Sequence, residues 1–275
     1  MFDFHFGDKE KILENPEEYI IFIKRMLPRW LNGIPDSECL AIWDALHQNT
    51  CTEPGVLAET GSGASTICLA LYAVLHETKA YSWDINGSRG VELRGILNDT
   101  IGRSFHISLW NHWTFVSAGS TDPHMGLGII EELKHKINFV FLDSLHTADH
   151  LIAELELILP SVNQGSVIAI DDASYTNNNY NYQYANIQRK KLGLSPVIEP
   201  EVNKGESYYV RVERLLQERF SQVDKLDDSY KRTYQDDIFF KYYQTDKKVM
   251  HAAGMEKLDE LEHRFDAWRV ATPLA

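Results

Sequence analysis

Short apolar segments alternate with stretches of helical periodicity between residues 55 and 171. The apolar segments cover residues 56–58, 80–83, 114–117, 137–142 and 167–170. The last two of these are apolar runs, broken only by Asn138 and bounded by polar residues, which is typical of strands buried on both faces of a sheet. The helical stretches lie between them, at 64–76, 89–101, 128–136 and 151–159. This alternation predicts right-handed βαβ units and an α/β fold with a doubly wound, mostly parallel sheet.

Outside this alternation the chain is predicted to be largely helical. Lys9–Leu31 carries apolar residues at mostly helical intervals, and Pro35–Glu38 forms a good helix start. Tyr208–Val212 predicts a late strand, an antiparallel partner at the sheet edge. From Leu215 onward the pattern is charged, aromatic and helical. We therefore expect an N-terminal helical segment (1–50), an α/β domain (51–214) and a helical C-terminal extension (215–275).

The charge and the cysteine content of the chain disfavour several classes of function. The formal charge is 27 − 40 = −13, which argues against nucleic acid or an anionic membrane surface as a partner. Three cysteines without CxxC spacing predict free thiols in a reducing compartment rather than a disulfide framework or a zinc site. The sequence shows neither a signal peptide nor a run of about 18 apolar residues. We expect a cytoplasmic protein that acts on small molecules.

A glycine-rich turn joins the first predicted strand to the helix that follows. Its residues are Glu59, Thr60, Gly61, Ser62, Gly63, Ala64, Ser65 and Thr66. The turn has no Gly-Lys-Ser/Thr, so it is not a P-loop, and Thr66 stands where a dinucleotide fingerprint has its third glycine. An acidic residue two positions before the first glycine would repel a pyrophosphate and favour a cationic ligand. This favours the sulfonium donor S-adenosylmethionine (SAM).

Acidic residues also follow the other strands. Asp84 comes at the end of the second strand, where a carboxylate can accept the hydroxyls of a ribose in both NAD and SAM sites. Asp143 follows the fourth strand, and Asp171 and Asp172 follow the fifth. Carboxylates that converge at one edge are best neutralised by a cation, and oxygen ligands suit Mg²⁺. The alternative is that Asp171 or Asp172 caps a helix or turn.

These residues together resemble a known family. The glycine turn, Asp84 and the Asp171-Asp172 strand end are similar to class I SAM-dependent methyltransferases. The block from Leu142 to Thr147, with the later Pro160, resembles the cephalosporin hydroxylase-like, rhamnosyl and macrocin-type O-methyltransferases. The resemblance covers about residues 55 to 175 and implies a seven-stranded Rossmann-like sheet, with SAM and Mg²⁺ as cofactors.

The resemblance also implies roles for single residues. The glycine turn would surround the methionine part of SAM, Asp84 would hold the ribose, and the end of the third strand would lie near the adenine. The implied cofactor-binding residues are Glu59, Thr60, Gly61, Ser62, Gly63, Ser65, Thr66, Asp84, Ser117, Gly119, Ser120 and Asp143. Asp143, Asp171 and Asp172 would ligate the metal, and Asp143 with His146 would be catalytic. His146 is the candidate general base because it lies close to the proposed metal ligand and its pKa can lie near neutrality.

The sequence thus predicts Mg²⁺-assisted methylation of a hydroxyl on a sugar or small natural product. Ser174–Tyr184, rich in Asn and Tyr, could fold over the acceptor or be a solvated loop. The competing interpretations are an NAD(P)-binding oxidoreductase and an inactive SAM-fold assembly partner. The C-terminal region, with Phe239 and Trp268, could support a homo-oligomer or pack on its own core.

Overall fold

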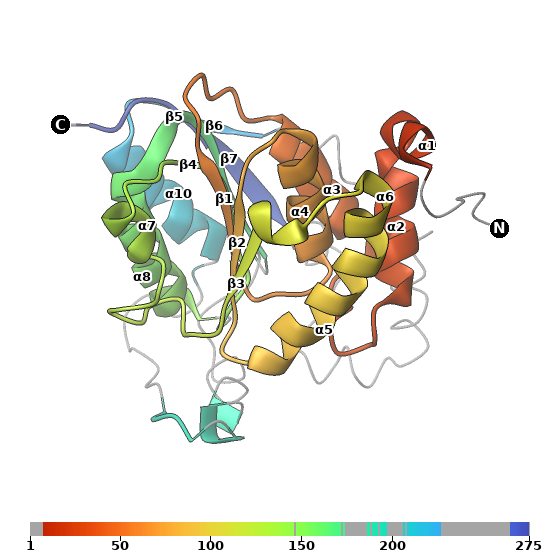
Figure 1. Ribbon diagram of the computed structural model, residues 1–275. Coiled ribbons are helices and arrows are strands. Elements are labelled where there is room, and N and C mark those ends of the chain that lie inside the picture. Colours follow the sequence, from red (N-terminus) through yellow and green to blue (C-terminus); the bar gives the residue numbers. More distant parts are fainter. Residues whose placement is uncertain are drawn as a thin grey trace.

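A seven-stranded β-sheet forms the centre of the protein (Figure 1). The computed structural model describes residues 8–145, 147–171, 173, 186–187, 189–191, 193–196, 206, 208–226 and 265–274. The strands are β1 (Val56–Thr60), β2 (Ala80–Trp83), β3 (Trp113–Val116), β4 (Ile137–Leu142), β5 (Val162–Ile170), β6 (Val223–Lys225) and β7 (Asp266–Val270). Their order is β3-β2-β1-β4-β5-β7-β6, and β7 runs antiparallel to both of its neighbours. The predicted doubly wound, mostly parallel seven-stranded sheet is confirmed.

Helices cover both faces of this sheet (Figure 1). One layer holds α1 (Lys9–Glu14), α2 (Pro16–Met26), α3 (Asp36–His47), α4 (Ser65–Leu75), α5 (Gly87–Leu97), a π-helical turn (Asn98–Gly102) and α6 (Arg103–Phe105). The other layer holds α7 (Ile129–Glu132), α8 (Ala148–Ile158) and α10 (Tyr208–Arg219). Short 3₁₀ turns at Leu109–Asn111 and Leu159–Ser161 lead into β3 and β5.

The two helical layers explain why β4 and residues 167–170 of β5 are apolar at nearly every position. Successive side chains of a strand point to opposite faces. In β4, Phe139 and Phe141 belong to the core under the first layer, and Val140 and Leu142 belong to the core under the second. Both positions of the pleat are therefore buried, as the sequence predicted for this strand.

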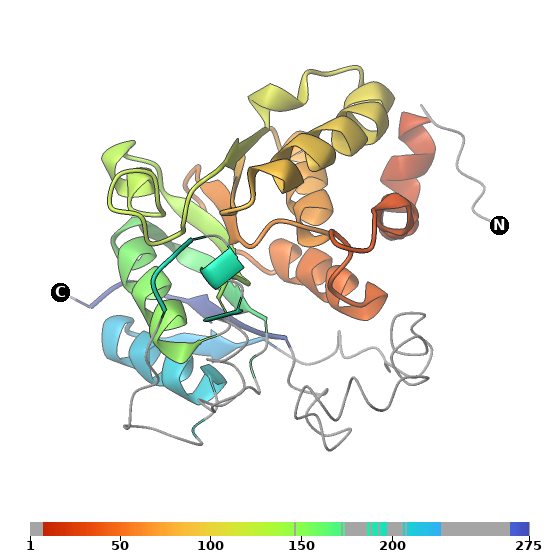
Figure 2. The same ribbon diagram turned by 90° about the horizontal axis from the view of Figure 1, so that it is seen from below.

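The strand register brings the ends of β1, β2, β4 and β5 together. Thr60 pairs with Trp83 on one side and with Leu142 on the other, and Leu142 pairs with Ile170. The residues that follow these strands therefore lie along one rim, which Figure 2 views from below. This rim is where ligands bind in open α/β sheets.

Three expected elements differ from the structure. Tyr208–Val212 is not a strand: it begins helix α10, because the buried residues Tyr208, Val212 and Leu216 recur every four positions. The expected helix over 128–136 is shorter, at Ile129–Glu132. The Lys9–Leu31 pattern forms two helices, since Asn15 caps α2 and Pro16 begins it.

The C-terminal residues contribute to the same sheet. The expected boundary between residues 214 and 215 falls inside α10. Beyond it, within the described residues, β6 and β7 extend the sheet next to β5, and Trp268 of β7 is fully buried. Trp268 therefore packs in the protein's own core.

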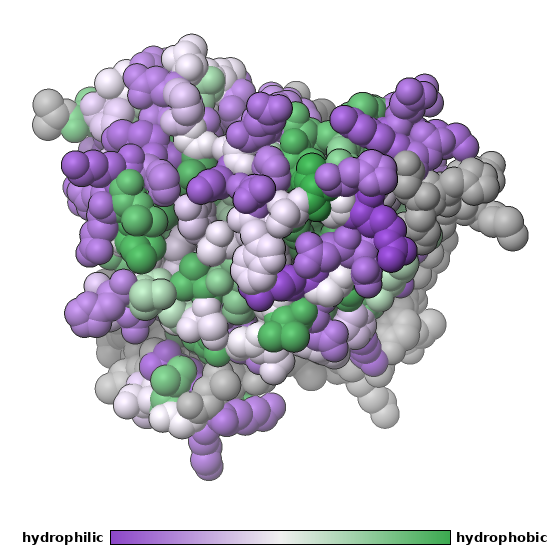
Figure 3. Space-filling model, viewed as in Figure 1, coloured by the Kyte–Doolittle hydropathy of each residue, from purple (hydrophilic) through white to green (hydrophobic). Residues whose placement is uncertain are grey.

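The face seen in Figure 3 is mainly hydrophilic, with hydrophobic side chains in several separate patches. Among the helices of the described part of the chain, none has the length and apolar character needed to cross a membrane.

Candidate active site

The glycine turn passes very close to the end of β4. Gly61 has φ +79°, and a Cβ at this position would lie 1.7 Å from the backbone oxygen of Asp143. A Cβ on Gly63 would lie 2.9 Å from the backbone oxygen of Leu31. Both contacts are with backbone, which cannot move aside as a flexible side chain would. The two positions therefore need glycine.

The backbone N–H groups of this turn are used inside the protein. Gly61 donates to the backbone oxygen of Trp83 at 2.9 Å. Ser62 donates to Oδ2 of Asp84 at 3.1 Å, and Gly63 donates to Oγ1 of Thr66 at 3.1 Å. The turn is thus fixed to β2 and to the first turn of α4. A pyrophosphate needs such N–H groups to point at it, and these three point elsewhere.

Glu59 lies beneath the turn, completely buried. The hydroxyl groups of Ser65, Thr66 and Ser82 donate to its carboxylate at 2.6, 2.5 and 2.6 Å. Burial raises the pKa of the Glu59 carboxyl to about 7, although the three hydroxyl donors act in the opposite direction. A direct contact with a cationic ligand, as expected from the sequence, would require Glu59 to leave these partners. In this structure its carboxylate braces the turn and the start of α4.

Asp84 lies at the end of β2, beside the turn, and is 8% exposed. Its Oδ2 accepts hydrogen bonds from Ser62 N and Ser62 Oγ, and its Oδ1 accepts from Asn86 N at 2.8 Å. Arg89, in the first turn of α5, forms an ion pair with Oδ2 at 3.1 Å. Sequence reasoning missed Arg89. The signal in the sequence that could have identified Arg89 was its position five residues after Asp84.

The end of β3 lies next to the end of β2. A Cβ on Gly87 would lie 3.0 Å from Oγ of Ser117, and a Cβ on Gly119 would lie 3.9 Å from the side chain of Ile85. Ser117 and Gly119 therefore border the β2–α5 connection that holds Asp84. Ser120 is 5% exposed and turns toward α8.

A small pocket opens at the ends of β4 and β5. Asp143 and Asp171 both line it, together with Leu142, Ser144, Leu145, Thr147, His150, Leu151, Glu154 and Tyr208. The backbone N–H of Asp143 binds Thr60 O at 2.9 Å, and that of Asp171 binds Leu142 O at 3.1 Å. Two of the three predicted metal ligands thus lie in one pocket beside the glycine turn. The described residues contain no cluster of three or more His, Cys, Asp or Glu side chains that could hold a metal ion.

Four polar side chains form a network in the wall of this pocket. Ser144 donates to Oε1 of Glu154 at 2.7 Å, and Nε2 of His150 lies 3.4 Å from the same oxygen. Nε2 of His150 also lies 3.0 Å from Oγ of Ser120. Glu154 is 1% exposed, so this network joins α8 to the ends of β3 and β4 from the inside. The i, i+4 spacing of His150 and Glu154 was visible in the sequence, but their shared contacts with two strand ends were not.

Some predicted residues lie outside the described part of the chain. They are His146, Asp172, the Asn/Tyr-rich segment Ser174–Tyr184 and Phe239. Their proposed roles stay predictions from the sequence.

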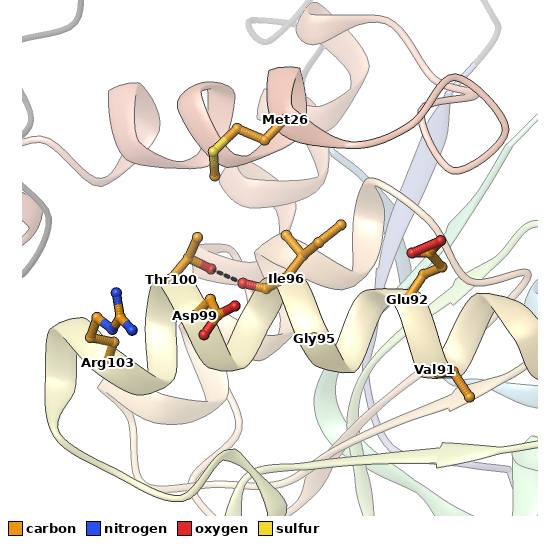
Figure 4. Close-up of a pocket in the computed structure, with 8 residues that line it drawn as sticks. All are labelled: Met26, Val91, Glu92, Gly95, Ile96, Asp99, Thr100 and Arg103. Atoms are coloured by element: carbon orange, nitrogen blue, oxygen red, sulfur yellow. Dashed lines mark hydrogen bonds between the residues drawn. The ribbon is translucent and has the colours of Figure 1, made fainter.

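A second pocket, of about 610 Å³, lies away from the rim between α2 and α5 (Figure 4). Met26 of α2 faces α5 across it, and Glu92, Asp99 and Arg103 give it a charged lining. Its lining contains none of the predicted site residues, so its larger size does not make it the candidate active site.

Comparisons with known proteins bear on the location of the candidate active site at the rim. A family model described as a methyltransferase domain matches residues 58–173, which include the glycine turn and the ends of β2, β4 and β5. A search of curated proteins finds no match.

Solved structures similar to the chain include three methyltransferases. They are the calicheamicin methyltransferase CalS11 (19% identity, 72% of this chain and 87% of that chain, TM-score 0.43), the SAH-bound methyltransferase PaMTH1 of Podospora anserina (10%, 93% and 87%, 0.49) and an O-methyltransferase from Bacillus cereus in complex with SAH (15%, 79% and 88%, 0.46).

Proposed function

We propose that the protein is a class I SAM-dependent methyltransferase that methylates a hydroxyl group of a sugar or another small natural product, a proposal supported by the match of residues 58–173 to a family model described as a methyltransferase domain. The observation that carries the proposal is the meeting of the glycine turn, Asp84 and Asp143 at one rim. Ser62 N lies 3.1 Å from Asp84 Oδ2, and Gly61 lies against the backbone oxygen of Asp143. A donor bound there would reach from the ribose site at β2 to the pocket at β4 and β5.

The hydrogen bonds that the glycine turn already makes within the protein favour SAM over a dinucleotide as its ligand. The N–H groups of Gly61, Ser62 and Gly63 are already used within the protein, so the turn offers little to a pyrophosphate. SAM has no phosphate and needs an acceptor for its ribose hydroxyls. This argues against the NAD(P)-binding oxidoreductase.

We assign the acceptor side of the reaction to the pocket at β4 and β5, whose volume of about 20 Å³ has room for an ion and not for a whole sugar. Asp143 and Asp171 offer carboxylate oxygens, the ligand type that Mg²⁺ prefers, and Asp172 would complete the set. A bound Mg²⁺ would lower the pKa of an acceptor hydroxyl and hold it in place. His146 would take the hydroxyl proton while the oxygen–methyl bond forms and the sulfur–methyl bond breaks, leaving S-adenosylhomocysteine (SAH). Positioning by the pocket walls supplies much of the acceleration.

Two further expectations concern the compartment and the oligomeric state. The cytoplasm stays the expected compartment, in line with the free thiols of Cys39, Cys51 and Cys68. A homo-oligomer stays a prediction from the C-terminal sequence.

The test is SAH release from SAM with a panel of hydroxylated sugars and natural products. We expect release with at least one acceptor in the presence of Mg²⁺, and its loss when EDTA replaces the metal. Full activity in EDTA would overturn the metal-assisted route and keep the methyltransferase. If NAD(P) is reduced in the presence of an alcohol and SAH is never released, the methyltransferase itself is contradicted.

A further inference from the structure

Arg89 holds the carboxylate that is proposed to bind the ribose. Its Nη1 donates to Oδ2 of Asp84 at 3.1 Å and to the backbone oxygen of Ser62 at 3.0 Å. A single guanidinium nitrogen therefore bridges the end of β2 and the glycine turn. These contacts lie where the nucleoside part of the donor would have to enter.

The acceptor capacity of Asp84 is nearly filled by the protein. Oδ2 accepts three donors, namely Ser62 N, Ser62 Oγ and Arg89 Nη1. Oδ1 accepts one donor, Asn86 N. An ionised carboxylate offers about four acceptor sites in all. Oδ1 can still accept one hydroxyl of a ribose diol, but Oδ2 already has more donors than lone pairs, so the second hydroxyl has to replace a donor there.

Arg89 is the donor that can leave most easily. The two Ser62 groups belong to the glycine turn, whose neighbours Gly61 and Gly63 are fixed by hydrogen bonds and close contacts. Arg89 is a long side chain, and 34% of it is exposed to solvent. An ion pair at this exposure is weak and sensitive to salt.

We propose that Arg89 is a displaceable cap on the ribose site and sets the affinity for the donor. The inference rests on the proposed function, because it assumes that Asp84 binds the ribose of SAM. The ion pair and the bond to Ser62 hold the turn in its unliganded form. Binding of the nucleoside replaces Arg89 at Oδ2, so the protein gives up one charge-assisted hydrogen bond when it takes the donor.

The test is calorimetric titration of the wild-type protein and of Arg89→Met with SAH. Met keeps the length and the apolar stem of the side chain but cannot bind Asp84. We expect Arg89→Met to bind SAH about threefold to tenfold more tightly, since the displaced bond is already absent. Arg94→Met is the matched control: Arg94 lies on the same helix and stacks on Trp110, with 3.6 Å from Cζ to the ring centroid. Its SAH affinity should equal that of the wild type.

Salt gives a second readout. Between about 50 and 500 mM NaCl, SAH binding to the wild type should strengthen, because screening weakens the Arg89–Asp84 pair. Arg89→Met should lose this dependence. Adenosine carries the same diol. The ratio of its dissociation constants for the wild type and for Arg89→Met should therefore equal the ratio found with SAH. Arg89→Gln serves the same comparison if Arg89→Met does not fold.

The outcomes separate the two claims. If the wild type binds SAH and the Arg89 variants bind it equally or more weakly, Arg89 is no cap and the inference fails alone. If neither the wild type nor the variants bind SAH or adenosine, the proposed function fails as well.

Discussion

The carboxylates at the two halves of the rim are used differently. At the ends of β1 and β2, the carboxylates of Glu59 and Asp84 accept hydrogen bonds from the protein. Glu59 accepts from three hydroxyl groups. Asp84 accepts from the glycine turn and from Arg89. At the ends of β4 and β5, Asp143 and Asp171 line a pocket. An acidic residue after a parallel strand can therefore brace the scaffold, as Glu59 does, line a pocket, as Asp143 and Asp171 do, or, as proposed for Asp84, hold the turn and bind a ligand.

This difference fits separate roles for the two sides, with the donor held at β1 and β2 and the acceptor at β4 and β5. On the β1–β2 side, the hydrogen bonds to Glu59 and within the glycine turn are formed before any ligand arrives, and only the Arg89–Asp84 pair is proposed to open. On the β4–β5 side, Asp143 and Asp171 line the pocket where an acceptor and a metal are proposed to bind. Substitutions on the two sides should therefore fail differently, in stability on the first and in turnover on the second.

Asp143→Ala should give the largest effect. Loss of a proposed metal ligand should lower SAH release at least 10³-fold, which corresponds to about 4 kcal/mol in the activation free energy. The backbone bond from Asp143 to Thr60 is kept, so the variant should remain folded. Asp149→Ala is the control, since Asp149 is exposed and pairs with Arg211 at 3.0 Å. Comparable activity in the two variants would remove Asp143 from the reaction.

Gly61→Ala should strongly destabilise the turn. The new Cβ would meet the backbone of Asp143 and would require a positive φ, which together should lower the free energy of unfolding by about 3 kcal/mol or more. Gly95→Ala is the matched control, because nothing lies within 4 Å of its Cβ position in helix α5. It should stabilise the protein by up to about 1 kcal/mol. Urea unfolding of both variants checks this, and equal stabilities would contradict the close contact.

Glu59→Gln should remove a pH dependence of stability. The folded pKa of about 7 lies above the ordinary carboxyl value of 4.5, so between these values the folded protein holds a proton that the unfolded chain releases. This contribution to stability is fully present below pH 4.5 and is lost as pH rises through 7. From pH 5 to pH 8 the wild type should lose about 2 to 3 kcal/mol relative to Glu59→Gln. Urea unfolding of both proteins at the two pH values measures this loss. An equal change in the free energy of unfolding in the wild type and in Glu59→Gln would show that Glu59 is ionised throughout.

Glu154→Gln should give the smallest effect. It weakens the bonds to Ser144 and His150 that join α8 to the rim, and should lower the free energy of unfolding by about 1 kcal/mol. The KM for SAM should rise slightly, because the ends of β3 and β4 are held less firmly. Glu156→Gln, an exposed position on the same helix, should be neutral. A neutral Glu154→Gln would mean that the network does not support the pocket.

The sequence predicted the sheet better than the site. Strands such as β4 were visible because burial on both faces requires a nearly unbroken apolar run, which in β4 only Asn138 interrupts. Tyr208–Val212 was misread because four of its five residues are aromatic or β-branched and look like a strand until the four-residue period up to Leu216 is included. The meeting of Asp84, Asp143 and the glycine turn followed from parallel topology alone. The saturation of Glu59 by Ser65, Thr66 and Ser82 did not, because it depends on side-chain directions in three separate elements.

The central claim is that the rim of β1, β2 and β4 binds the adenosyl part of SAM. Its most direct test is calorimetric titration of the wild-type protein with SAH and, separately, with NAD⁺. We predict saturable binding of SAH with matching thermal stabilisation, and none with NAD⁺. Binding of NAD⁺ without binding of SAH would contradict the account.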